Sequence, residues 1–201
     1  MNNFTDVVGN ADLYSGTNIY FTYDRFCNPN SAIYFSKGYL QIPPGVYFSG
    51  DFTVTAWINL RSYQSYSRMI DFGNGQNNDN VILSFNGLTY NLRGEIRSAQ
   101  PQSQKIIIAS SVSIQLNQWY HVAFVLSGTN GIIYVNGSLA ANDVLYVPND
   151  VKRSSNYIGK SNWNNNDRNA DAVYDDLKIY NEALSAESIL NEFTITSYSN
   201  G

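Results

Sequence analysis

The chain has 201 residues, of which 43% are hydrophobic and 14% are charged, and its net charge at pH 7 is −4. This length suits a single all-β domain over residues 1–201. The acidic balance argues against nucleic acid as a partner, because nucleic-acid binding needs Lys and Arg to neutralise phosphates. No run of about twenty apolar residues is present, so insertion into a membrane is not expected.

Short apolar runs separated by Gly, Asn and Pro predict many strands along the chain. Such strands at short intervals, without the longer helical stretches of a βαβ unit, are typical of a sandwich or jelly roll. The predicted strands are Ile19–Tyr23, Ala32–Phe35, Tyr39–Ile42, Phe52–Leu60, Arg68–Phe72, Asn80–Phe85, Leu88–Arg97, Lys105–Ser110, Gln118–Leu126, Ile132–Val135, Val144–Val147, Asn156–Gly159 and Ala172–Tyr180.

The segment 119–137 has the clearest pattern. Its first strand is apolar on both of its alternating faces, so both faces must be covered, which places this strand inside a two-layer β structure. Its second strand, Ile132–Val135, ends at Asn136-Gly137, the dipeptide that best tolerates the positive φ angles of a tight hairpin turn. This segment therefore predicts a central hairpin.

One short helix is predicted near the end of the chain. Ser185 stands at the N-cap position, Glu187 lies in the first turn, and Ile189 can meet Leu184 in a hydrophobic staple. We expect one or two turns, through Phe193, that close one end of the sandwich.

Six stretches in order and in register resemble the laminin-G-like (pentraxin-like) branch of the concanavalin A-like lectin/glucanase superfamily. The resemblance covers about residues 9–193. The stretches are DRFCNPNSAIYF (24–35), GDFTVTAWI (50–58), NQWYHVAFVL (117–126), IIYVNG (132–137), YIGKSNW (157–163) and YDDLKIYNEALSAESI (174–189).

This resemblance implies a jelly-roll β-sandwich of two curved antiparallel sheets, used as a binding module in extracellular, adhesive or carbohydrate-active proteins. It does not name a ligand, because fold does not fix function. One departure is Cys27, where relatives usually carry Gly; a glycine-only backbone angle is therefore not expected there.

The sequence argues against catalysis. Glycosidases need two carboxylates that flank the scissile bond, and no E-x-D-x-E cluster is present. Glu95 stands between Arg93 and Arg97 on one strand face, which favours a paired, ionised carboxylate over a general acid. Asp175 and Asp176 are adjacent and point to opposite faces.

The single histidine, His121, would have to serve any Ser-His-Asp or Cys-His site, with Cys27 as one candidate nucleophile. Its place in a core strand instead predicts a structural histidine whose ring packs and satisfies a hydrogen bond. Cys27 is interpreted as a small buried apolar residue.

Calcium is the candidate cofactor, because it prefers carboxylate, carbonyl and amide oxygens. The resemblance implies a site between an early loop and the last core strand, at Asp24 and Asp175. A second candidate is the rim formed by the loops GNGQNNDN (73–80) and SNWNNNDRNAD (161–171). Alternatively, these side chains only stabilise turns. The rim candidates are Asn77, Asp79, Asn165, Asp167 and Asp171.

A sugar-binding surface would combine aromatic faces with planar amides at the same rim. Its candidates are Trp163, Asn164, Asn165, Asn77 and Asp79, with Tyr63 and Tyr66 nearby. We therefore expect a non-catalytic, lectin-like module for a carbohydrate or glycoprotein, outside the cell or at its surface and within a larger chain. The alternatives are a protein–protein adhesion module and, last, a glycoside hydrolase.

Overall fold

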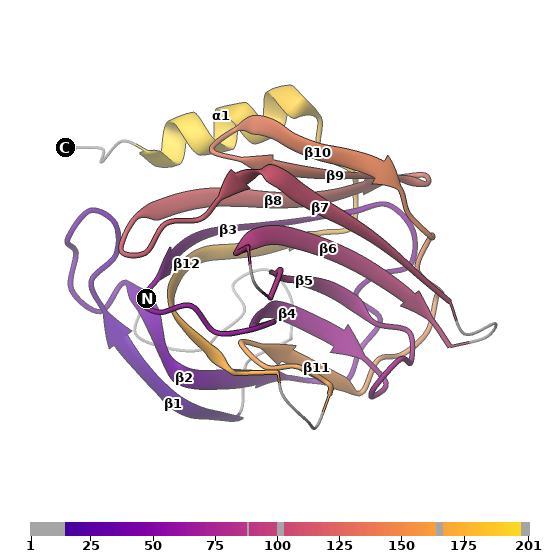
Figure 1. The fold of residues 1–201 in the computed structure, drawn as a ribbon, viewed down its shortest axis with the longest axis horizontal. Coiled ribbons are helices and arrows are strands. Elements are labelled where there is room, and N and C mark those ends of the chain that lie inside the picture. Colours follow the sequence, from indigo (N-terminus) through magenta and orange to yellow (C-terminus); the bar gives the residue numbers. More distant parts are fainter. Residues whose placement is uncertain (1–14, 88, 100–102, 164–166, 198–201) are drawn as a thin grey trace.

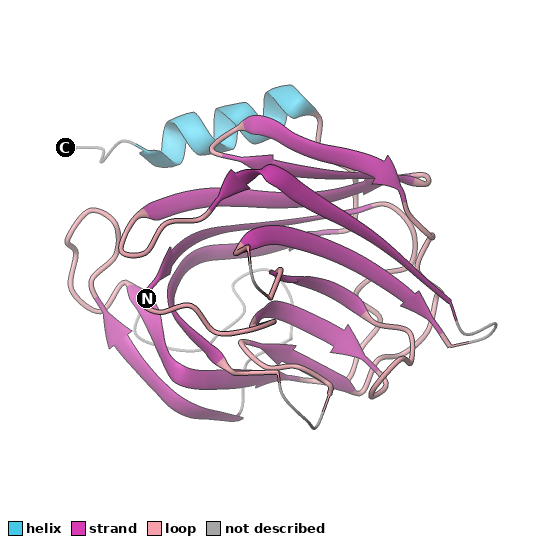
Figure 2. Ribbon diagram, viewed as in Figure 1, coloured by secondary structure: helices cyan, strands magenta, loops and turns pink. Residues whose placement is uncertain are grey.

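The computed structural model describes residues 15–87, 89–99, 103–163 and 167–197, and strands make up most of these residues (Figure 2). One helix, α1 (Ala186–Ser197), follows the strands. The strands are β1 (Ser15–Thr22), β2 (Ala32–Ile42), β3 (Phe52–Leu60), β4 (Arg68–Gly73), β5 (Val81–Phe85), β6 (Asn91–Ser98), β7 (Ser103–Ser113), β8 (Trp119–Ser127), β9 (Asn130–Val135), β10 (Ser138–Val144), β11 (Ser155–Ile158) and β12 (Ala170–Tyr180).

The strands pair in one antiparallel sheet with the order β10-β9-β8-β3-β12-β2-β11-β4-β5-β6-β7, and β1 pairs with β2. The sheet curls into two layers, with β4, β5 and β6 facing β12, β3 and β8, and its last strand β7 packs against β10 (Figure 1). This arrangement is a nearly closed β-sandwich. The predicted all-β jelly-roll class with a C-terminal helix is confirmed.

The core lies between the two layers and is filled by alternate residues of each strand. On β3, the inward residues run from Phe52 to Leu60 in steps of two, and all of them are buried. Aromatic rings cross the layers edge to face: Phe52 lies 4.8 Å from Phe48 and 5.3 Å from Phe124, measured between ring centroids. Such contacts add to the free energy gained from apolar burial.

The hairpin predicted over residues 119–137 forms, but its turn joins β9 to a strand that the sequence did not predict. Asn136 and Gly137 have φ angles of 50° and 74°, as a type I′ turn requires, and Ser138 pairs with Val135. The strand after the turn is β10, whereas the pattern predicted Val144–Val147. Its sequence, SLAANDV, has few β-branched or aromatic residues, so pairing with β9 rather than propensity forms this strand.

The two-sided apolar character of β8 is explained by α1, which lies over the outer face of this layer. Ile189 packs against Ala123, Val125 and Tyr134, and the Ser188 amide donates to the N-cap hydroxyl of Ser185 at 3.1 Å. The helix covers a sheet face, so its predicted role of closing one end of the sandwich is wrong.

The helix also continues four residues beyond its predicted end at Phe193. The Trp57 indole donates to Thr196 Oγ1 at 2.9 Å, and Arg25 Nε donates to the Thr196 carbonyl at 2.7 Å. These long-range contacts hold a last turn whose own sequence, rich in Thr and Ser, has low helix propensity.

His121 lies on the outer face of β8 beneath the helix and is only 1% exposed. Its ring packs 5.4 Å from the ring of Trp57, so the predicted packing is confirmed. The predicted hydrogen bond is absent: neither ring nitrogen has a partner among the described residues, and Nε2 lies 4.0 Å from Glu192 Oε1. Burial lowers the pKa of His121 to about 4, against the opposing charge of Glu192.

Stability should therefore fall in mild acid because of His121. The unfolded chain takes up a proton near pH 6.5 and the folded chain only near pH 4, so the unfolded state binds more protons in between and stability rises with pH. Between pH 7 and pH 4.5 the wild type should lose roughly 2–3 kcal/mol more unfolding free energy than His121→Phe. Denaturant titrations at both pH values measure this difference; parallel losses in the two proteins would contradict it.

Cys27 differs from its predicted environment. Its side chain is exposed, and its φ angle is 65°, the left-handed conformation that favours glycine. The turn sets this angle, because the Cys27 amide donates to the Asp24 carbonyl at 3.2 Å. The interpretation of Cys27 as a buried residue without a glycine-like angle is therefore wrong.

Replacing Cys27 with Gly should raise the unfolding free energy by about 0.5–1 kcal/mol. The change removes the steric cost of the left-handed angle, which exceeds the entropy cost of a more flexible unfolded chain. Asn30→Gly is the matched control, since Asn30 has φ 57° in the same loop and asparagine tolerates this angle. Equal effects of both substitutions in denaturant unfolding would show that strain at Cys27 is not the cause.

Candidate functional site

Charged side chains gather on the outer face of β4, β5 and β6, the face turned away from the core. Arg93, Glu95 and Arg97 alternate along β6, so all three point to this side. On β4, Asp71 lies in the same cross-strand row as Glu95, and Arg68 in the same row as Arg93, each pair separated by one residue of β5.

Glu95 lies between two arginines and is fully buried, at 0% exposure. Arg93 Nη2 lies 2.7 Å from Glu95 Oε2, and Arg97 Nε makes a short contact with Oε1. The pairing predicted from the alternation is thus confirmed. Because one carboxylate faces two guanidinium groups, the three side chains together carry one net positive charge.

Asp71 is the second fully buried carboxylate of this face, and it holds a loop. It accepts hydrogen bonds from Asn80 Nδ2 at 2.9 Å and from the backbone amide and Nδ2 of Asn162 at 2.9 and 2.8 Å. Burial raises the pKa of Asp71, although Arg68 and these donors oppose the shift. These hydrogen bonds attach the loop that contains Trp163 to strand β4.

Asp71 and Glu95 do not form the catalytic pair of a glycoside hydrolase in the arrangement seen here. They are two strands apart, which at the usual strand spacing is roughly 10 Å, a separation close to that of an inverting pair. Both are 0% exposed, however. Amide groups donate to Asp71, and two guanidinium groups contact Glu95. Neither carboxylate can therefore reach a glycosidic oxygen.

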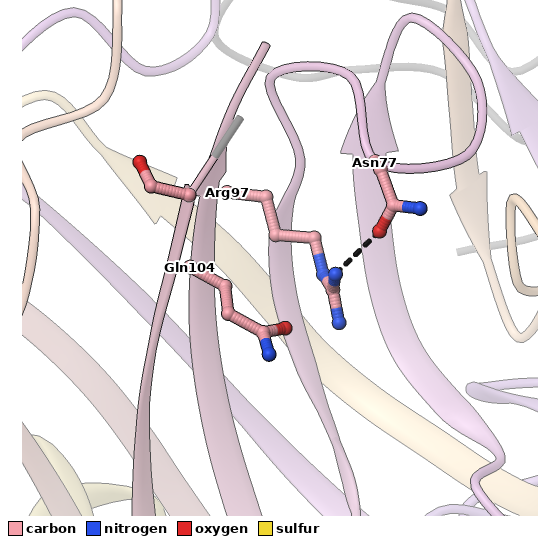
Figure 3. A pocket seen from close by; sticks show the side chains of 4 residues that line it. Asn77, Arg97 and Gln104 are labelled. Atoms are coloured by element: carbon pink, nitrogen blue, oxygen red, sulfur yellow. Dashed lines mark hydrogen bonds between the residues drawn. The ribbon is translucent and has the colours of Figure 1, made fainter. Parts of the chain in front are cut away.

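A cavity of about 300 Å³ opens at the end of this face, lined by Asn77, Arg97, Ser103 and Gln104. Arg97 and Gln104 are register partners on β6 and β7, and Asn77 belongs to the loop between β4 and β5. Figure 3 shows the Gln104 amide and the Arg97 guanidinium directed toward the same space, with Arg97 bonded to Asn77.

Arg97 joins the two asparagine-rich loops of the rim. Its Nη1 donates to Asn77 Oδ1 in the loop 73–80, and its guanidinium carbon lies 4.9 Å from the centroid of the Trp163 ring in the loop 161–171. Trp163 is half-buried, and Arg68 lies 5.3 Å from the same ring. The predicted ligand residues Asn77 and Trp163 are thus brought together by a residue that was predicted only as a partner of Glu95.

The remaining predicted ligand residues are placed differently. Asp79 is 7% exposed; its Oδ1 accepts from Asn149 Nδ2 at 2.7 Å, and its carbonyl accepts from the buried Arg153 at 2.8 Å. It anchors loops behind the cavity and does not line it. Asn164 and Asn165 lie outside the described residues.

Both carboxylates of the calcium site implied by the resemblance, Asp24 and Asp175, contact protein donors. Asp175 pairs with Arg25, whose Nη2 also lies 2.8 Å from Asp176 Oδ2. Asp24 accepts from the amides of Phe26 and Asn28 at 2.8 and 2.9 Å. Burial raises the pKa of Asp24, but hydrogen bonds from Asn28 outweigh that effect and lower it.

At Asp175, burial and then the charge of Asp176 raise the pKa to about 6, against the effect of Arg25. An internal cation and backbone donors thus already satisfy both carboxylates of that implied site.

The rim carboxylates are likewise engaged by protein donors. Asp167 Oδ2 accepts from Arg68 Nη2 and from Ser161 Oγ, both at 2.8 Å. Asp171 accepts from Tyr34 at 2.9 Å and, in a short contact, from Ser62. Among the described residues, no group of three or more His, Cys, Asp or Glu side chains is placed to hold a metal ion. Calcium at these positions would have to displace those protein donors, and calcium binding stays a prediction from the sequence.

Sequence reasoning missed Gln104, Ser103 and Arg68 as neighbours of the site. The alternation of charges along β6 was a signal for the outer face, but the partners across β4 and β7 depend on strand register. The loop 161–163 is brought to the site by the buried Asp71, a contact between residues that are far apart in the sequence.

Solved structures with the same fold include several binding domains. The chain is similar to the binding domain of Paraclostridial Mosquitocidal Protein 1 (TM-score 0.73, 18% identity, 95% of this chain and 49% of that one). It is also similar to the ligand-binding domain of botulinum neurotoxin serotype D in complex with N-acetylneuraminic acid (TM-score 0.67, 17% identity, 92% and 46%). The chain thus spans about half the length of these toxin domains.

A third similar structure is domain 4 of an extracellular arabinanase from Geobacillus stearothermophilus in complex with arabinotriose (TM-score 0.64, 20% identity, 94% of this chain and 92% of that one). At these identities the likeness concerns the fold. A comparison with curated protein sequences finds no significant match. No helix in the described residues is long and apolar enough to cross a membrane.

A family model described as the concanavalin A-like lectin/glucanases superfamily matches residues 35–190. This match covers more than half of the chain and agrees with the two-layer antiparallel fold and with the resemblance seen in the six sequence stretches. The chain therefore belongs to the concanavalin A-like lectin/glucanases superfamily.

Proposed function

We propose that this protein is a non-catalytic carbohydrate-recognition module that binds a sugar at the cavity lined by Asn77, Arg97, Ser103 and Gln104. The observation that carries the proposal is the meeting of both asparagine-rich loops at Arg97, beside the Trp163 ring. The volume of about 300 Å³ is at the lower end for small-molecule sites and suits a single sugar unit.

The chemistry of the cavity matches that of a sugar. Planar amides and guanidinium groups hydrogen-bond to hydroxyls in a fixed direction. The Trp163 ring lies beside the cavity and packs against Arg97, so it helps to hold that guanidinium group in place. Several polar groups are available: the side-chain amide of Gln104, the Nδ2 of Asn77 and the Nη2 of Arg97 make no hydrogen bond to the described residues. A ligand can use these groups without breaking the bonds that hold the loops.

The similar structures support this proposal, since one was solved with arabinotriose and another with N-acetylneuraminic acid. Their settings, a toxin and an extracellular enzyme, also support a role outside the cell, within a larger chain. The burial of Asp71 and Glu95 supports binding without hydrolysis.

Protein–protein adhesion is the second candidate function, and one observation favours it. An apolar strip lies along β10 and the segment after it, where Leu139 is 60% exposed and Val144, Tyr146 and Val147 are also exposed. Exposed apolar residues that gather in one region mark interaction sites more often than scattered ones do. A negative glycan screen would direct attention to this strip.

Glycan binding tests the first candidate directly. Trp163→Ala should weaken binding of the best ligand from a glycan array at least tenfold, because Arg97 loses the ring that holds its guanidinium group at the cavity. It should lower the unfolding free energy by no more than about 2 kcal/mol, since Trp163 is half-buried. Tyr146→Ala, which removes an exposed aromatic ring from the apolar strip, is the control and should leave glycan affinity unchanged.

Calorimetric titration of the folded variants measures these affinities. If Trp163→Ala binds glycans as well as the wild type does, the cavity beside Arg97 is not the binding site.

Calcium should have little effect on folding. The four candidate carboxylates are satisfied by protein donors, so we expect melting in 5 mM calcium, roughly a hundredfold over a Kd near 50 μM, to match melting in excess chelator within about 1 °C. A site of that affinity formed only in the folded state would add about 2.7 kcal/mol, several degrees for a chain of this size. A calcium-dependent rise that Asp175→Asn abolishes would show that the ion displaces Arg25.

A further inference from the structure

The cavity contains one ionised side chain among its described lining residues, and that side chain is positive. Arg97 is accompanied by the neutral residues Asn77, Ser103 and Gln104. The nearest acidic partner of Arg97, Glu95, is fully buried and is shared with Arg93. A ligand in the cavity therefore meets a guanidinium group whose charge is only half balanced.

The hydrogen bonds of Arg97 leave one end of its guanidinium group for a ligand. Nε contacts Glu95, and Nη1 donates to Asn77, whereas Nη2 has no hydrogen bond or ion pair to the described residues. The Glu95 contact and the Trp163 ring, 4.9 Å away, hold the group in place, so an anion would be bound by a donor that is already oriented.

A neutral sugar does not require this arrangement, because amides such as Gln104 and Asn77 satisfy hydroxyls without a charge. A carboxylate does use it, since charge-assisted hydrogen bonds to arginine are shorter and stronger than neutral ones. The amide donors on either side of Arg97 could then bind the hydroxyls of the same sugar ring.

We infer that this cavity selects a sugar that bears a carboxylate, such as a uronic or a sialic acid, with Arg97 Nη2 as the donor to that carboxylate. The inference rests on the proposed function, because it assigns the ligand class of the same cavity. Arg97 is thus the specificity-determining residue of the module.

Pairs of ligands in which the carboxylate is either free or methyl-esterified test this inference. Trigalacturonate and sialyllactose are each titrated into the protein beside the uncharged methyl ester of the same compound. We expect one of the two acids to bind at least tenfold more tightly than its ester, and to lose affinity as sodium chloride rises from 50 to 500 mM. Binding of trigalacturonate would identify the ligand as a uronate, and binding of sialyllactose would identify it as a sialate.

Gln104→Glu supplies the decisive variant, because it adds a negative charge to the cavity without disturbing the buried Glu95. It should weaken binding of the acid at least tenfold more than binding of the ester, because both ligands lose the Gln104 amide donor but only the acid is repelled by the new charge. Lys105→Gln is the matched control: it makes the same change of net charge on the neighbouring residue of β7, whose ammonium group lies near Tyr146 and outside the cavity. This control should retain the preference for the acid.

Arg97→Gln should also abolish the preference for the acid over its ester, provided that thermal unfolding shows a folded protein. Equal affinity of acid and ester, both weakened by Trp163→Ala, would overturn the acidic class while leaving sugar binding intact. If neither trigalacturonate, sialyllactose, their esters nor any sugar of a wider array binds, the proposed function fails together with the inference. Unchanged acid binding by Gln104→Glu would also overturn the inference.

Discussion

The buried carboxylate of Glu95 organises the outer face of the second sheet layer. A charged group without solvent must be paired, and Glu95 meets this requirement by contacting Arg93 on one side and Arg97 on the other. The position of Arg97 follows from that pairing, and the contacts of Arg97 with Asn77 and Trp163 follow in turn. The candidate site therefore depends on an electrostatic constraint inside the protein as much as on the loops at its surface.

Internal guanidinium groups have a comparable role elsewhere in the chain. Arg153 is fully buried and donates to the carbonyls of Phe48, Asp79 and Asn149, which ties the segment before β11 to the loop behind the cavity. Arg25 pairs with Asp175 and reaches the last turn of α1. Arginine suits these positions because its planar group offers five donors in fixed directions. Asp79 and Asp175, which the sequence offered as possible metal ligands, are the partners that these arginines contact.

The placement of α1 explains why one strand can be apolar on both faces. The inner residues of β8 fill the core, and its outer residues Ala123 and Val125 pack under Ile189. This second apolar layer also encloses His121 without a hydrogen-bond partner among the described residues. The same burial that stabilises the helix on the sheet makes this imidazole hard to protonate, which couples the stability of this layer to pH.

Much of the architecture follows from the order of the amino acids alone. The bounds of β3, Phe52–Leu60, agree with those predicted, and the turn at Asn136-Gly137 and the N-cap at Ser185 also form as expected. These features depend on local rules: alternation along a strand, positive φ at Asn-Gly, and a hydroxyl that satisfies a free helix amide. The pairing of Glu95 with its flanking arginines belongs to the same class, because residues two apart on a strand share a face.

The site itself was decided by tertiary structure. Asn77 and Trp163 lie far apart in the sequence, and only the curl of the sheet and the bonds from Asn162 to Asp71 bring their loops to Arg97. Strand β10 and the last turn of α1 likewise have weak local preferences and form because β9, Trp57 and Arg25 supply partners. Hydrogen-bond and ion-pair partners depend on strand register and loop closure, which a linear pattern does not contain.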